Sequence, residues 1–302
     1  MDNFYCVKGN TWCIDTGATL MAVYRLNEHD IVMIDTGLAY GRPETKCIMH
    51  VLDGFQLNVK AIIATHGHLD HIGNNNILAG KYDCKIYMYG SEAYDCMSVE
   101  SMRIQHTGVA YEEVKDALVK MTSRVDVFIT PWEKKINILG ADFEIVHTPG
   151  HSPSHISIIT PDNVMMAGDA LMSKDEIVKA KIPYACNFAV DFESKRKIAA
   201  MKCDKYIISH RGICDSESIA DEVEANIEYL KSRAEIIHGY IEDGMCFDDI
   251  AAAVLTLMNI KVANRYYFFD LHGMVKPYVQ YLEECGEIQA YYEKGYIRYK
   301  VL

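Results

Sequence analysis

The sequence of 302 residues has no apolar run long enough to cross a bilayer. Even the stretch from Ile136 to Val146 is interrupted by Asn137, Gly140 and Asp142, whereas a spanning helix needs about 20 consecutive apolar residues. The first residues also lack the basic and apolar segments of a secretory signal peptide. We therefore expect a soluble, cytoplasmic protein that does not associate with membranes.

Signals for disulfide pairing and clusters of basic charge are scarce as well. The ten cysteines include no Cys-x-x-Cys pair and no regular framework, so we interpret them as free thiols of a reducing compartment. Acidic residues outnumber basic ones by 42 to 30, and the formal net charge is -12. Because nucleic-acid binding depends on clustered lysine and arginine, a small-molecule substrate is favoured over a nucleic acid.

The sequence is rich in metal-binding side chains at one place, the segment Thr65-His66-Gly67-His68-Leu69-Asp70-His71. It follows an apolar run, Val59 to Ala64, that has the length and composition of a buried strand. The donors are therefore expected on a loop at the end of a strand. A tetrahedral zinc ion takes about four ligands and a catalytic one keeps a position open, so further donors downstream would indicate two metal ions.

Three further donors follow predicted apolar strands in the same way: His151 after Pro149-Gly150, Asp169 after Gly168, and His210 after Ser209. A strand holds the residue just beyond its end in a fixed position, and glycine lets the backbone turn sharply there. We expect the same unit of strand, turn and donor at all four places, and hence one composite site.

The order of predicted elements indicates an α/β protein with two regions. Strands and helices alternate through residues 1–215, where residues 98–130 are predicted to form a helical insertion near the site. Residues 216–302 are predicted to form three helices, at 222–240, 247–258 and 272–285, followed by a β-hairpin with its tip at 293–295. This extension is similar to a winged helix. Because the chain is acidic, we expect the extension to mediate homodimerisation or to form a lid, and not to bind DNA.

The pattern His-x-His-x-Asp-His, followed by a distant His, an Asp after Gly and a final His, resembles the metallo-β-lactamase superfamily, in particular its glyoxalase II and lactonase members. The resemblance implies a four-layer αββα sandwich with a helical C-terminal extension. It also implies a division of ligands between two metals, with Asp169 bridging them: His66, His68 and His151 for the first, and Asp70, His71 and His210 for the second. Asp35, in an Asp-Thr-Gly turn, would support these ligands from behind without binding metal.

The chemistry expected of such a site is hydrolysis. Two divalent ions, Zn²⁺ by preference although Fe²⁺ and Mn²⁺ accept the same donors, lower the pKa of a shared water from about 15.7 toward 7 and polarise a carbonyl group. The bridging hydroxide would be oriented by Asp70, and Tyr184 is a candidate hydrogen-bond donor to the substrate. We predict a metal-dependent hydrolase acting on a thioester, lactone or ester.

Two alternatives remain open at this stage. One is a phosphodiesterase or ribonuclease of the same fold, and the other is a sensing or regulatory binding protein in which hydrolysis is incidental. Apolar side chains predicted near the site would suit an acyl chain. These candidates are Met97, Met102, Val109, Tyr111 and Phe188.

Overall fold

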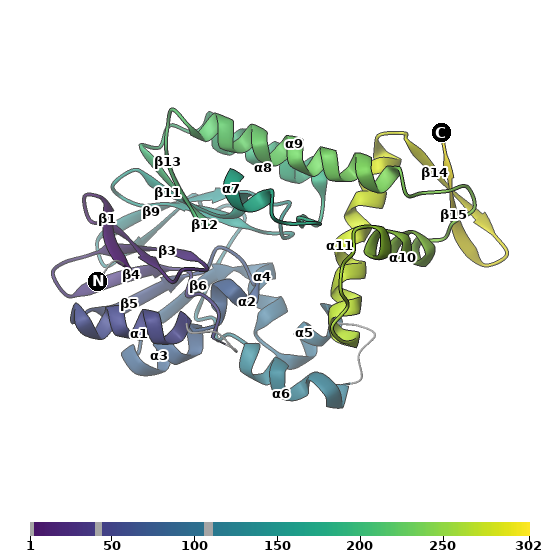
Figure 1. Cartoon of the computed structure of the whole chain (residues 1–302). Coiled ribbons are helices and arrows are strands. Elements are labelled where there is room, and N and C mark those ends of the chain that lie inside the picture. The colour runs from purple at the N-terminus through teal and green to yellow at the C-terminus, as the bar shows by residue number, and fades with distance from the viewer. Residues whose placement is uncertain (1–2, 40–43, 106–110) are drawn as a thin grey trace.

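The computed structural model describes residues 3–39, 44–105 and 111–302, and its central feature is a pair of β-sheets flanked by helices (Figure 1). The seven strands of the first sheet lie in chain order: β1 (Phe4–Lys8), β2 (Thr11–Asp15), β3 (Leu20–Arg25), β4 (Asp30–Ile34), β5 (Asn58–Ile63), β6 (Lys85–Tyr89) and β7 (Val127–Ile129). The second sheet has the order β13-β12-β11-β10-β9-β8, with bounds β8 (Lys135–Ile138), β9 (Ala141–His147), β10 (Ile156–Ile159), β11 (Val164–Met172), β12 (Lys205–His210) and β13 (Gly212–Asp215).

Helices cover the outer faces of both sheets. Those of residues 44–200 are α1 (Glu44–Gly54), α2 (Leu69–Ile72), α3 (Asn75–Tyr82), α4 (Gly90–Cys96), α5 (Val99–Gln105), α6 (Tyr111–Met121), α7 (Lys174–Ile177) and α8 (Phe188–Ala200). Successive strand residues point to opposite faces, so in β5 Ile62 packs with Ile48 of α1 while Ile63 packs with Phe143 of the second sheet. This alternation produces the predicted four-layer αββα sandwich.

The C-terminal region consists of α9 (Ile219–His238), α10 (Phe247–Leu257), α11 (Arg265–Glu284), β14 (Ile288–Glu293) and β15 (Tyr296–Val301). The two strands pair around Lys294-Gly295, which both have positive φ as a tight hairpin turn requires, so the predicted helices and hairpin are confirmed. The hydrophobic core runs on from Tyr206 of β12 to Val223 of α9 and Val275 of α11, across the predicted boundary at 215. The extension therefore packs on the second sheet.

The segment predicted as a helical insertion, residues 98–130, is helical only in part. Helices α5 and α6 lie within it, but Val127–Ile129 forms β7, which pairs in parallel with β6. These three residues are β-branched or aromatic, as strands prefer, and Ile129 is buried between the sheets. The end of this segment belongs to the first sheet.

Two further expectations concern free cysteines and membrane-spanning segments. All ten cysteines are free. Among the described residues, none of the helices is both long enough and apolar enough to cross a membrane.

Candidate metal centre

Six of the seven predicted donors lie at or beyond the ends of three strands. His66 and His68 follow β5, Asp70 and His71 lie in α2, and His210 is the last residue of β12. His151 lies in the loop between β9 and β10.

Asp169 is placed differently from the prediction, which ended its strand at Ala167. β11 continues to Met172 because its pairing with β12 shifts register around Gly168. Gly168 has a φ of +61°, a conformation that glycine adopts readily. Asp169 therefore lies inside a strand, beside a bulge of the kind that re-aims a side chain.

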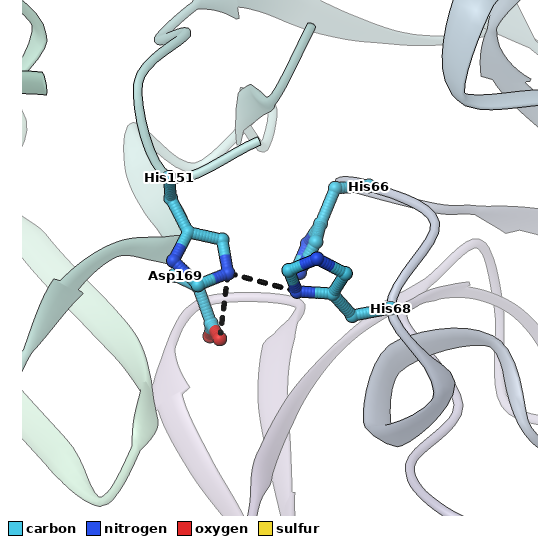
Figure 2. A group of neighbouring side chains, drawn as sticks. All are labelled: His66, His68, His151 and Asp169. Atoms are coloured by element: carbon cyan, nitrogen blue, oxygen red, sulfur yellow. Dashed lines mark hydrogen bonds and ion pairs between the residues drawn. The ribbon is translucent and has the colours of Figure 1, made fainter. Parts of the chain in front are cut away.

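The structure brings the seven side chains together in two groups that share Asp169. The donor atoms within each group lie within 4.8 Å of one another: His66, His68, His151 and Asp169 in the first, and Asp70, His71, Asp169 and His210 in the second. Figure 2 shows how the side chains of the first group converge. His151 Nε2 lies 2.9 Å from His68 Nδ1 and 3.5 Å from Asp169 Oδ2.

The second group approaches both oxygens of the Asp169 carboxylate. His210 Nε2 lies 3.1 Å from Asp169 Oδ2 and 3.7 Å from Asp70 Oδ2. His71 Nε2 lies 3.1 Å from Asp169 Oδ1, but the two atoms are not in hydrogen-bonding geometry and both remain without a hydrogen-bond partner.

Hydrogen bonds behind the site orient the histidine rings. Asp35 Oδ2 accepts from His71 Nδ1 at 2.8 Å and from the Thr65 hydroxyl at 2.9 Å. Because that hydroxyl donates to Asp35, it is free to accept from His66 Nδ1, 3.0 Å away. The His66 ring then presents an unprotonated Nε2 to the site, the form in which imidazole binds metal, and the His71 ring is oriented with its Nε2 toward Asp169. Asp35 thus contacts a donor from behind, and its support of metal binding without itself binding metal stays a prediction.

The unpaired atoms of the cluster fit divalent cations. His66 Nε2, His71 Nε2 and Asp169 Oδ1 are buried and have no hydrogen-bond partner, and buried polar atoms are rarely left so. Burial lowers the pKa of His66 and of His151 well below the usual value, which keeps both rings neutral. Burial also opposes a charge on His71, but the Asp169 and Asp35 carboxylates outweigh it and raise the pKa of His71.

Two residues outside the predicted ligand set hold the donor loops, and sequence reasoning missed Glu92. Glu92 of α4 is 4% exposed and accepts from Gly67 N at 3.0 Å, Ser152 Oγ at 2.6 Å and Ser154 N at 3.0 Å. His155 Nε2 accepts from the backbone N–H of Asp169 at 3.0 Å. No local sequence pattern marks Glu92, because its partners lie 25 to 62 residues away along the chain.

The cluster opens onto a cavity of about 630 Å³. Tyr184 lines this cavity, its carbonyl oxygen lies 3.3 Å from His151 Nδ1, and burial raises the pKa of its phenol to about 12.

The predicted apolar wall is confirmed only at Met102. Phe188 packs in the core against Tyr278, and Met97 is exposed outside the cavity lining. Val109 and the side chain of Tyr111 lie outside what the structure describes.

The comparisons with known proteins agree with this arrangement. A model of the metallo-beta-lactamase superfamily matches residues 14–210, a range that includes all seven donors. The chain belongs to this superfamily. Hydroxyacylglutathione hydrolase GloC of Haemophilus influenzae is 30% identical over 146 residues, which cover 48% of this chain and 63% of that protein. The probable metallo-hydrolase YflN of Bacillus subtilis is 27% identical over 159 residues, covering 49% of this chain and 58% of its own length.

Solved structures of the superfamily resemble the whole chain in fold. A metallo-beta-lactamase family protein of Thermus thermophilus aligns with a TM-score of 0.67 at 15% identity, over 100% of this chain and 99% of that one. A beta-lactamase domain protein of Burkholderia ambifaria also gives a TM-score of 0.67, at 18% identity, over 99% of this chain and 94% of its own. The C-terminal helices are thus included in the structural likeness.

Proposed function

We propose that this protein is a binuclear metal-dependent hydrolase of a small carbonyl compound, a thioester, lactone or ester. The observation that carries the proposal is the position of Asp169, which belongs to both donor groups at the wall of one cavity. The chain spans about 60% of the length of GloC and YflN. The name of GloC, a hydroxyacylglutathione hydrolase, supports thioester hydrolysis.

We assign His66, His68 and His151 to one cation and Asp70, His71 and His210 to the other, with Asp169 between them. Nitrogen and oxygen donors of this kind bind Zn²⁺, Fe²⁺ or Mn²⁺, and we propose Zn²⁺. When bound, such a pair of cations polarises the scissile carbonyl group and lowers the pKa of water.

The side chains at the cavity wall have separate roles in this proposal. The Asp70 carboxylate is 37% exposed and faces the cavity, so Asp70 Oδ2 orients the attacking water and accepts its proton. The Tyr184 hydroxyl donates a hydrogen bond to the substrate. His71 is held by Asp35, which prevents its ring from turning away.

The test combines elemental analysis of the purified protein with a panel of acyl thioesters, homoserine lactones, aryl esters and bis-aryl phosphates. We expect two metal ions per chain and turnover of at least one carbonyl class, and we expect Asp70→Asn to abolish that turnover. Preferential hydrolysis of the phosphate diesters would refute the proposal in favour of a phosphodiesterase or ribonuclease. Negligible turnover of the whole panel by the metal-loaded protein would favour a binding or sensing role.

A further inference from the structure

The cavity beside the donor cluster is polar at one end and apolar over most of the rest of its wall. Its apolar lining comes from six elements and one loop. The residues include Leu69 of α2, Met102 of α5, Met172 of β11, Ile177 of α7, Leu230 of α9, Phe269 and Met274 of α11, and Ile182 after α7. A volume of about 630 Å³ is in the range of small-molecule sites. The wall is suited to an apolar group attached to the reacting carbonyl.

Helix α11 is fixed in place as one side of this cavity. The Tyr278 hydroxyl, buried in the core, donates to the Pro183 carbonyl at 2.6 Å, and its ring stacks edge-on against Phe188. Pro183 and Tyr184 both line the cavity. Pro183, which anchors α11, directly precedes Tyr184, whose carbonyl oxygen lies beside His151. These two contacts hold α11 and the donor cluster in fixed relative positions. In Figure 1, α11 descends from α9 toward α5.

The charges in the lining disfavour an anionic chain. Lys195 is the one lysine or arginine among the described lining residues, and its Nζ already donates to Asp191 at 2.6 Å. Asp70 and Asp169 lie at the donor end of the cavity, where the proposed cations would balance their charges. Away from the donors, an anionic chain would find no unpaired lysine or arginine among the described lining residues, whereas an uncharged chain needs none.

Gly273 lies on the cavity-lining face of α11, one helical turn from Phe269. Glycine inside a helix lowers its stability relative to alanine, so its presence needs a reason. Gly273 does not have a positive φ, and a Cβ built on it would meet no atom within 4 Å. Gly273 is exposed, and because it lines the cavity, a side chain at 273 would enter open space beside the cavity.

We infer that the cavity is an acyl chamber for an uncharged, apolar chain, and that Gly273 sets the length of chain it accepts. The inference rests on the proposed function, since it names the substrate of the same site. A larger side chain at 273 would project into the chamber and shorten it, while the donor cluster at its other end would be unaffected.

Pro277 offers a competing reason for the glycine. Proline has no N–H to bond the carbonyl four residues earlier, which is that of Gly273, and its ring crowds that carbonyl. If Gly273 served only to relieve this crowding, Gly273→Ala would destabilise the protein. If it serves to leave the chamber open, Gly273→Ala should unfold at the same or a higher urea concentration.

The test measures kcat/KM for a series of acyl thioesters from acetyl to decanoyl with the metal-loaded protein, Gly273→Leu, and Lys276→Leu. Lys276 is an exposed residue of the same helix that does not line the cavity, so it controls for adding leucine to α11. For the unchanged protein we expect about a fourfold gain per methylene until the chamber is full. Gly273→Leu should lower kcat/KM for the longest chains by about tenfold or more and leave acetyl within about twofold.

A binding measurement separates this inference from the proposed function. The binding of the apolar probe N-phenyl-1-naphthylamine to the metal-free protein is followed by the increase in its fluorescence. The unchanged protein and Lys276→Leu should bind the probe with equal affinity, and Gly273→Leu should bind it about tenfold more weakly. If thioesters are hydrolysed with no dependence on chain length, the acyl chamber is refuted and the hydrolase is retained. If no carbonyl compound is hydrolysed, the probe decides: equal binding by the two leucine variants overturns the inference, and selective loss in Gly273→Leu supports it.

Discussion

Replacing Glu92 by glutamine tests whether this carboxylate holds the donor loops together. Glu92 Oε2 accepts from the Gly67 backbone, whereas Oε1 accepts from Ser152 and Ser154. Glutamine keeps one carbonyl oxygen and presents an NH₂ group to the other set of donors. At least one buried N–H or hydroxyl donor then loses its acceptor, at about 1–3 kcal/mol each. We expect Glu92→Gln to lower the free energy of unfolding of the metal-free protein by about 2 kcal/mol, measured by urea titration.

The same change should lower the metal affinity of the first donor group more than that of the second. Gly67 lies between His66 and His68, and Ser152 follows His151, so the first donor group loses its support while Asp70, His71 and His210 keep theirs. Competition with a chromophoric chelator should show about 10–100-fold weaker binding of one Zn²⁺ ion. Glu217→Gln, at an exposed glutamate between β13 and α9, is the matched control. A Glu92→Gln protein with unchanged unfolding and unchanged Zn²⁺ affinity would refute the reasoning.

Further substitutions test the other contacts of the site. Asp35→Asn removes a carboxylate acceptor from His71 Nδ1 and should weaken binding of one Zn²⁺ ion about 10–100-fold in the same competition assay; unchanged affinity would contradict its positioning role. Gly168→Ala places a Cβ 2.5 Å from His155 Nε2 at a φ of +61° and should lower the urea midpoint by the equivalent of about 2–4 kcal/mol; an unchanged midpoint would show that the bulge adapts. Asp169→Ala should lower both the occupancy of two metals by elemental analysis and the rate, and full activity would exclude a bridging role.

The strand ends that carry the donors could be predicted because the signals are local. Val59 to Ala64 is an apolar run that stops at Thr65, and the donors follow within a few residues. Lys294-Gly295 likewise marks a hairpin turn by its own conformational preference. In each case the residues that determine the structure are neighbours in the sequence.

Features that depend on distant partners could not be predicted in this way. The extension of β11 past Gly168 depends on its pairing with β12, and the role of Glu92 depends on donors 25 to 62 residues away. A glutamate in an isolated stretch of sequence is normally read as solvent-exposed. Only the tertiary structure shows that this one is buried between two loops.

The division of the chain explains why the donor cluster could be predicted from the sequence and the wall of the cavity could not. All seven donors lie within residues 14–210, the range matched by the superfamily model, whereas Gly273 and the rest of the α11 wall lie beyond it. In α11, Leu271, Val275 and Tyr278 follow helical spacing and mark a buried face. Phe269 and Gly273 form a second stripe, which the pattern alone cannot assign to a cavity. Because α9 and α11 pack on the second sheet, this stripe comes to line the same cavity as the donors. Substitutions in α11 can therefore change substrate preference without altering the metal ligands.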